Sequence, residues 1–211
     1  MKRREFSLSA AALTAGALAL PARAQPREGK DYRKLAKPVA TEAPAGKIEV
    51  VEFFGYFCPH CNSFEPALNA WLKTAPKDIV LHRVPVNFNA KTVPMQKLYY
   101  TLEGLGKLEP LHAQAFRYVH VERKPLQEDA QVLAWAGMQP GLDQAKFKEM
   151  YNSFGVANQI RKATQLQQAY DVEGVPSMGV AGRYYVDGTM AGSTDNMLRL
   201  VEQLAAQVRK G

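Results

Sequence analysis

The chain has 211 residues, of which 46% are hydrophobic and 22% charged, and it carries a formal net charge of +7. This composition is typical of a soluble globular protein with a hydrophobic core, and the length suggests one domain with room for an insertion. The Lys and Arg residues are scattered among acidic residues, which argues against a nucleic-acid-binding protein.

The first 24 residues have the pattern of a secretory signal peptide. Basic residues at positions 2–4 precede an apolar run over residues 6–20, and Ala22 and Ala24 supply the small residues of a cleavage site. The apolar run is too short to cross a membrane comfortably. We therefore expect residues 1–24 to be removed on export. Both the general secretory route and the twin-arginine route remain open. Cleavage removes four basic residues and one acidic residue, leaving a net charge of about +4.

The next segments predict an arm, a central strand and a crossover. Residues 25–46 are polar and contain several prolines, so we expect an extended arm with a short edge strand between residues 32 and 39. Residues 47–54 are apolar on both faces, which is typical of a central strand covered by helices. A helix should begin at Cys58, and a second strand, parallel to the first, is expected over residues 78–88.

The remainder of the chain changes to a helical period. Apolar stripes over residues 91–155 predict a block of helices, and a further helix is expected over residues 158–170. A hairpin over residues 178–186 and a last helix capped by Ser193 or Thr194 follow.

This order of elements predicts an α/β protein with a thioredoxin-like fold and an inserted all-helical subdomain. The thioredoxin-like domain is expected over residues 47–90 and 156–211, preceded by the N-terminal arm over residues 25–46. The helical subdomain is expected over residues 91–155. Its fourth apolar stripe, interpreted as core like the other three, contains Phe147, Met150, Tyr151 and Phe154.

Cys58 and Cys61 are the only cysteines in the chain, and they are separated by two residues at the expected helix start. Two thiols at this spacing can close on each other, which indicates a redox-active dithiol. A bridge across so short a loop removes little chain entropy, so a structural disulfide is a poor explanation. A zinc site needs about four ligands, and only these cysteines and His60 lie together, so we expect no metal.

The position of Cys58 favours the thiolate, which is the nucleophile of disulfide exchange. A helix start supplies unpaired N–H groups and a positive dipole end, and Pro59 fits its first turn. His60 adds a positive charge when it is protonated. A low pKa of Cys58 would stabilise the reduced form and make the disulfide an oxidant. Cys61, one turn further into the helix, should be the more buried thiol that resolves the mixed disulfide.

Glu52 is unusual in an otherwise apolar strand. It shares a strand face with Val50 and Phe54, so we expect its carboxyl to be buried and its pKa to be raised. Such a carboxyl could exchange a proton with Cys61 as that thiol enters or leaves the disulfide. The alternative is a glutamate at a partly wetted strand position.

Several segments around the dithiol carry a family resemblance. They are Glu52–Phe54, Phe57, Cys58–Cys61, Phe64–Glu65 and Val86–Phe88. These segments resemble the active-site stretch of the DsbA family of periplasmic thiol:disulfide oxidoreductases, within the thioredoxin superfamily. The Pro-His dipeptide between the cysteines is characteristic of that family, and the likeness covers nearly all of the chain after residue 24.

The resemblance implies a role for each site residue. Cys58 would be the attacking and leaving thiol, Cys61 the resolving thiol, and Glu52 the buried acid near Cys61. Pro176 would be a cis-proline facing the disulfide, which leaves the backbone of Val175 free to pair with an extended substrate.

Arg83 stands where relatives often have a lysine paired with the buried acid. Arginine does not readily lose its charge, so this departure leaves the proton pathway open. The histidines His82, His112 and His120 are interpreted as ordinary surface or packing residues.

The resemblance also implies the partners. Oxidised protein would donate its disulfide to newly exported, unfolded proteins in the periplasm. A quinone-linked DsbB-type membrane enzyme would reoxidise it, with no soluble cofactor. We expect a monomer, since no dimerisation domain is visible. Two alternatives stay open: a disulfide isomerase or reductant, and a peptide-binding chaperone module in which the dithiol is incidental.

Overall fold

The computed structural model describes residues 25–210, so the expected signal peptide at residues 1–24 lies outside the described residues. Five strands form one sheet in the order β1-β5-β4-β2-β3. The strands are β1 (Arg33–Lys34), β2 (Ile48–Phe54), β3 (Ile79–Pro85), β4 (Ser177–Val180) and β5 (Tyr184–Asp187). No helix between residues 25 and 210 is long and apolar enough to cross a membrane.

Strand β2 is the centre of the structure. It pairs in parallel with β3 and antiparallel with β4, and all seven of its residues are buried. A strand covered on both faces needs apolar side chains in both directions, which is why its sequence does not alternate. The predictions of a central strand and of a parallel crossover through a helix are therefore confirmed.

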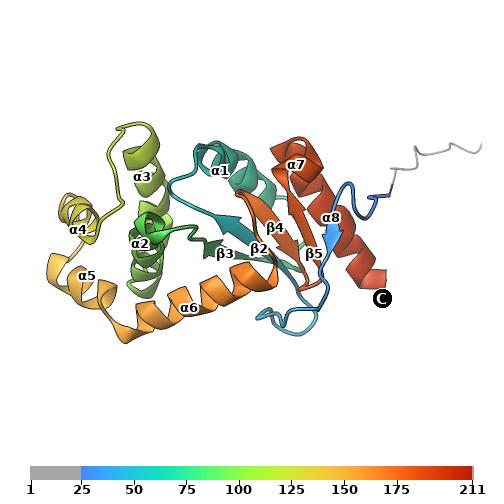
Figure 1. Ribbon diagram of the computed structural model, residues 1–211, viewed down its shortest axis with the longest axis horizontal. Coiled ribbons are helices and arrows are strands. Elements are labelled where there is room, and N and C mark those ends of the chain that lie inside the picture. Colours follow the sequence, from blue (N-terminus) through green and yellow to red (C-terminus); the bar gives the residue numbers. More distant parts are fainter. Residues whose placement is uncertain (1–24, 211) are drawn as a thin grey trace, which may run out of the picture.

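Helices cover both faces of the sheet. Figure 1 shows α2 to α5 grouped at one end of the molecule, while α6 returns along the sheet. The helices are α1 (Pro59–Leu72), α2 (Val93–Gly104), α3 (Leu108–His120), α4 (Asp129–Gly137), α5 (Gln144–Tyr151), α6 (Phe154–Ala169), α7 (Gly188–Ala191) and α8 (Thr194–Lys210), with a 3₁₀ turn at Ala90–Thr92.

Two hydrophobic cores lie on opposite faces of the sheet. One contains Val50 of β2 with Leu68 of α1 and Leu204 of α8. The other contains Val51 of β2 and extends through Leu98 of α2 into the helical block. Neighbouring residues of β2 thus enter different cores, because successive side chains of a strand point to opposite faces.

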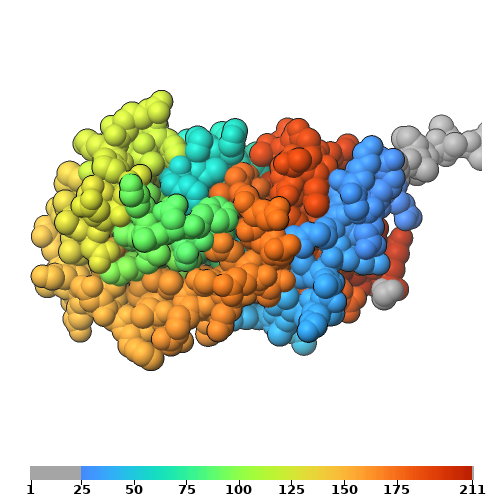
Figure 2. All heavy atoms as spheres, viewed as in Figure 1, coloured from blue at the N-terminus to red at the C-terminus, as the bar shows by residue number. Residues whose placement is uncertain are grey.

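The arm holds the hairpin edge of the sheet. Strand β1 pairs antiparallel with β5, so the expected edge strand is present, although it is only two residues long. Arg33 donates to the backbone carbonyl oxygens of Tyr170 and Asp171, which follow α6. Figure 2 shows the arm lying beside α6 on this face of the molecule.

The structure differs from the sequence predictions at the start of α6. The chain breaks between α5 and α6, where Oγ of Ser153 accepts the N–H of Val156 and caps the new helix. The resulting change of direction turns Phe154 outward, and 77% of its surface is exposed. The interpretation of Phe154 as a core residue is therefore wrong, while Phe147 and Tyr151 of the same stripe are buried. The short helix α7 was also not expected.

Candidate active site

The dithiol lies where β2 ends and α1 begins. Cys58 is the N-cap residue of α1 with an extended backbone, and Pro59 and His60 occupy the first turn. Sγ of Cys58 accepts a hydrogen bond from the backbone N–H of Cys61 at 3.4 Å. The sulfur thereby takes the place of the side-chain oxygen that usually caps a helix, in the position where the helix favours negative charge.

The surroundings of Cys58 lower the pKa of its thiol to about 6. The largest cause is a hydrogen bond from the Cys61 thiol, followed among the lowering causes by the backbone N–H groups of Cys61 and His60. The positive charge of His60 ranks after these contacts, and burial acts in the opposite direction. His60 therefore contributes less to the ionisation of Cys58 than the contacts with Cys61 do.

Cys61 differs from Cys58 in burial and in pKa. Both thiols are free, but Cys61, in the first turn of α1, is fully buried, whereas Cys58 keeps 7% of its surface exposed. Burial raises the pKa of Cys61 strongly, and the neighbouring Cys58 thiol raises it further. Of the two sulfurs, only Cys58 is therefore ionised near neutral pH.

The loop before β4 faces the Cys58 sulfur. The Val175–Pro176 peptide bond is cis, as expected from the sequence. Sγ of Cys58 donates to the backbone carbonyl oxygen of Val175 at 3.2 Å, which places the two segments in direct contact. Pro176 is buried, whereas Val175 is only partly buried.

Glu52 is a fully buried carboxyl group on β2. Burial raises its pKa to about 8, the negative charge of Glu65 adds to the rise, and Arg83 opposes it. Nε of Arg83 donates to Oε2 of Glu52 at 2.9 Å. Oε1 of Glu52 has no hydrogen-bond partner among the described residues. The expectation of a buried acid with a raised pKa is confirmed, and Arg83 is its cationic partner.

Three residues to which the sequence analysis assigned no role in the site extend this group. Glu65 of α1 lies 3.4 Å from Arg83, measured from Oε2 to the guanidinium. Its Oε1 lies 3.4 Å from Nε2 of His112 on α3. Nδ1 of His112 is 2.8 Å from the hydroxyl of Tyr56 in the loop before Cys58. Glu65 is four residues after Cys61, which could have placed it near the dithiol, but no local signal points to His112.

His112 is a buried packing residue, as expected, with its ring against Phe54 and Phe116, and both of its ring nitrogens also lie near polar atoms. Nε2 of His120 lies 2.8 Å from the backbone oxygen of Tyr56, so it also supports the active-site loop. His82 lies away from this loop, with Nδ1 3.5 Å from Oε1 of Glu49.

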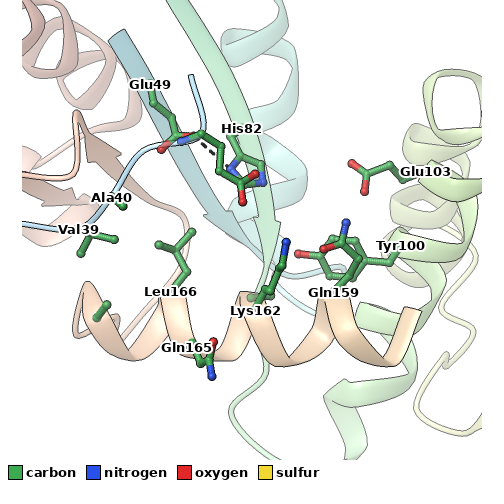
Figure 3. Close-up of a pocket in the computed structure, with 13 residues that line it drawn as sticks. Val39, Ala40, Glu49, His82, Tyr100, Glu103, Gln159, Lys162, Gln165 and Leu166 are labelled. Carbon is green, nitrogen blue, oxygen red and sulfur yellow. Dashed lines mark hydrogen bonds and ion pairs between the residues drawn. The ribbon is translucent and has the colours of Figure 1, made fainter. Parts of the chain in front are cut away.

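A cavity of about 330 Å³ lies near the other end of β2. Figure 3 shows Glu49 and His82 from the sheet, Tyr100 and Glu103 from α2, and Lys162 from α6 around it. It contains neither cysteine, so it is separate from the dithiol. No cluster of three or more His, Cys, Asp or Glu side chains in residues 25–210 is arranged to hold a metal ion.

Aromatic surface flanks the dithiol on one side. The rings of Phe57 and Phe88 are in edge contact with centroids 6.0 Å apart, and Phe88 is 43% exposed. Phe64 and Met178 are fully buried and belong to the core.

Comparisons with known proteins agree with this geometry. Residues 72–205 match a family model described as "DSBA-like thioredoxin domain". A thiol:disulfide interchange protein DsbA of Bordetella parapertussis is 43% identical over 204 residues, covering 96% of each chain. Another from Pseudomonas aeruginosa is 39% identical, covering 86% of this chain and 85% of its own.

Solved structures give the same result for the fold. The crystal structure of Pseudomonas aeruginosa DsbA superposes with a TM-score of 0.81 at 37% identity, covering 86% of this chain and 94% of that one. The Xylella fastidiosa oxidoreductase DsbA also superposes with a TM-score of 0.81, at 30% identity, covering 89% of this chain and 100% of that one. With its helical block inserted in a thioredoxin-like fold and its relatives spanning nearly its whole length, the chain belongs to the DsbA family of thiol:disulfide oxidoreductases.

Proposed function

We propose that this protein is an oxidant that donates a Cys58–Cys61 disulfide to newly exported proteins. The observation that carries the proposal is the contrast between the two sulfurs. Cys58 caps a helix and has a lowered pKa, whereas Cys61 is buried and has a raised pKa. In disulfide exchange the sulfur with the lower pKa is the better leaving group and the more exposed one is attacked.

The exchange takes two steps. A substrate thiolate attacks Sγ of Cys58, a mixed disulfide forms, and the Cys58–Cys61 bond breaks with its electron pair leaving on Cys61. The Cys61 thiolate then takes up a proton. A second substrate thiolate attacks the substrate sulfur of the mixed disulfide and expels Cys58 as a thiolate. The substrate is oxidised to a disulfide, and the protein is left as a dithiol.

The ionisation of Cys58 sets the direction of this exchange. At pH 7 a thiol with a pKa of about 6 is mostly ionised. This ionisation stabilises the reduced protein by at most about 1.4 kcal/mol, or ~30 mV for two electrons, before solvent screening is counted. The effect favours donation of the disulfide, and it is smaller than a pKa well below 6 would give.

The other site residues are proposed to support these steps. Glu52 is the proton source for Cys61. Its ionised form raises the pKa of that thiol, which indicates that the two groups are near each other, and its own raised pKa keeps it protonated near neutral pH. The backbone of Val175, in contact with Cys58, would pair with an extended substrate segment beside Pro176. His60 and Pro59 would form the helix turn that presents Cys58.

The cellular setting is part of the proposal. Residues 1–24 would be a cleaved signal peptide that directs a monomeric protein to the periplasm. A DsbB-type membrane enzyme linked to quinone would reoxidise the dithiol. The arm would comprise residues 25–46 and the helical subdomain residues 91–155, with the thioredoxin-like domain over 47–90 and 156–211.

The test uses oxidised protein and a reduced, unfolded protein that contains several cysteines. We expect the wild type to form disulfides in the substrate with loss of two thiols per turnover, and Cys58→Ser to form none. Cys61→Ser, the matched control, keeps Cys58 but has no disulfide to donate, so it should not oxidise the reduced substrate. Given a substrate that already contains a disulfide, its Cys58 thiolate should attack that bond, expel one substrate thiolate and remain as a mixed disulfide, whereas Cys58→Ser should form none. Reshuffling of scrambled disulfides without net oxidation would instead identify an isomerase. Binding that is indifferent to Cys58→Ser would identify a chaperone module.

A further inference from the structure

We propose that His112 is a positioning residue that fixes the carboxylate of Glu65 as the ionised partner of Arg83, so that the proton of this buried cluster stays on Glu52. His112 does not touch the sulfurs, and it acts only through Glu65. The inference deepens the proposed function, because it explains how Glu52 holds a proton that Cys61 can receive.

The contacts of His112 fix its orientation. The hydroxyl of Tyr56 is 2.8 Å from Nδ1, and that hydroxyl has no other acceptor among residues 25–210. Burial raises the pKa of Tyr56 well above its usual range, so the phenol keeps its proton and donates it to Nδ1. A neutral imidazole that accepts at Nδ1 carries its hydrogen on Nε2. Nε2 lies 3.4 Å from Oε1 of Glu65, and each of these two buried atoms lacks a hydrogen-bond partner among the described residues, so Oε1 is the acceptor nearest to hand for that hydrogen.

Among the described residues, Glu65 has two hydrogen-bond donors at its Oε2, and only Nε2 of His112 lies beside its Oε1. Nδ2 of Asn69 donates to its Oε2 at 3.2 Å, and the guanidinium of Arg83 lies 3.4 Å from the same oxygen. Burial acts to raise the pKa of Glu65, but the contacts with His112, Arg83 and Asn69 outweigh it and the pKa is lowered.

Glu52 has fewer donors. Arg83 donates to one oxygen, and the other has no partner among the described residues. Arg83 is a single cation facing two carboxyl groups in a buried site. Because an unpaired buried charge is very costly, one of the two carboxyls is expected to be neutral.

The contacts of Arg83 alone would favour ionisation of Glu52 rather than of Glu65. Its contact with Glu52, at 2.9 Å, is shorter than its contact with Glu65, at 3.4 Å. Arg83 by itself would therefore favour an ionised Glu52. The contacts of Glu65 with Asn69 and His112 reverse that preference. Of these, His112 is the one beside the second oxygen of Glu65: Nε2 and Oε1 lie 3.4 Å apart, and neither atom has a hydrogen-bond partner among the described residues.

The other titratable groups near the cluster do not supply a competing charge. Cys61 of α1 has a raised pKa and stays protonated. Tyr99 of α2 also has a raised pKa because it is buried, and so it stays neutral like Tyr56. The ionisation of the cluster is thus decided between Glu52 and Glu65, with Arg83 as the cation.

The experiment is a carboxyl ¹³C NMR titration of Glu52 and Glu65 in the reduced full chain. In the wild type we expect Glu65 to titrate at the lower pH and Glu52 to titrate near pH 8. In His112→Phe, which keeps an aromatic ring beside Phe54 and Phe116, the midpoint of Glu52 should fall by about one pH unit or more as that of Glu65 rises. An unchanged midpoint of Glu52 in His112→Phe would overturn the proposal.

Three further variants make the test specific. His112→Gln can still donate an N–H towards Glu65 and should restore the wild-type midpoints, whereas a purely steric role of the ring would not be rescued. His120→Phe is the matched control, since His120 contacts the backbone of Tyr56 and no carboxylate, and an equal fall there would refute the assignment. If His112→Phe does not fold, Glu65→Gln tests the coupling between Glu65 and Glu52 through which His112 would act. It must lower the midpoint of Glu52, and an unchanged midpoint there would overturn the proposal.

The titration does not depend on disulfide donation. If the protein failed to oxidise a substrate while the midpoints moved as expected, the proposed function would fail and the role of His112 would stand. If donation occurred with midpoints insensitive to residue 112, the reverse would hold.

Discussion

Glu52 of β2 and Arg83 of β3 are direct partners in the register of the sheet, and their side chains meet at 2.9 Å on its α1 face. The parallel pairing of the two strands fixes this contact, so the arginine reaches the carboxyl without crossing another element. Burial still dominates the ionisation of Glu52, whose pKa is about 8 despite the adjacent cation. Glu52 is therefore paired with Arg83 and yet keeps its proton at neutral pH.

We expect Glu52→Gln to stabilise the protein at neutral and alkaline pH. The pKa of Glu52 is raised in the folded state, so its stabilising contribution is complete below its unfolded pKa of about 4.5 and is lost as the pH rises through about 8. Glutamine carries no such dependence. The variant should gain about 3 kcal/mol over the wild type in unfolding free energy at pH 7.

Urea unfolding of the reduced protein at pH 4.5, 7 and 8.5 measures this gain. Glu65→Gln is the opposite case, because the pKa of Glu65 is lowered on folding and its contribution is lost as the pH falls. A constant difference between Glu52→Gln and the wild type across this pH range would contradict the expectation.

We expect Cys61→Ala to raise the pKa of Cys58 more than His60→Ala does. The thiol of Cys61 provides the largest stabilisation of the Cys58 thiolate, while the charge of His60 ranks after the backbone contacts. Loss of the thiol hydrogen bond should raise the pKa by about one unit or more. The ultraviolet absorbance of the thiolate, followed against pH, reports the midpoint in both variants, and a larger rise in His60→Ala would reverse the assignment.

The sequence contained enough information to place the fold and the dithiol. The apolar run of β2 and the Cys-Pro-His-Cys segment after it are local patterns, and each specifies one element: a strand buried on both faces and a helix capped by sulfur. Glu52 was identifiable for the same reason, since a charged residue inside such a strand has no solvent to reach.

The partners of Glu52 could not be predicted in this way. His112 enters the site from α3, 60 residues further along the chain, and only the packing of the helical block against α1 brings it to Glu65. The exposure of Phe154 was missed for a related reason. An apolar stripe shows which residues share a helix face, but it does not show that the chain breaks at Ser153 before that face is used.

We expect Gly179→Ala to destabilise the fold strongly. Gly179 of β4 faces the ring of Tyr170, and an added Cβ would lie 2.3 Å from Cε1 of that ring. Tyr170 is itself fully buried and packs against Phe53, so it cannot move aside without disturbing the core. A loss of about 1–3 kcal/mol in unfolding free energy is expected from such overpacking.

Gly188→Ala is the matched control for this change. Gly188 begins α7, and no atom lies within 4 Å of the position that its Cβ would occupy. Alanine there should be neutral or slightly stabilising, because it restricts the unfolded chain. Thermal unfolding of both variants measures the difference in stability. Equal unfolding temperatures would show that Tyr170 can move away from the added methyl group at little cost.

Finally, two phenylalanines of one apolar stripe should respond very differently to truncation. Phe147 is fully buried and stacks on Tyr151, with ring centroids 5.8 Å apart. Phe147→Ala should therefore cost about 3–5 kcal/mol, since it removes a large apolar side chain and leaves a cavity. Phe154 is exposed. Within residues 25–210, the one group in contact with the face of its ring is the guanidinium of Arg161, which lies 5.3 Å from the ring centroid. Phe154→Ala should cost no more than about 0.5–1 kcal/mol, the range of an exposed cation–π pair. Chemical unfolding of the two variants compares these costs directly, and a cost for Phe154→Ala as large as that for Phe147→Ala would mean that α6 begins inside the core.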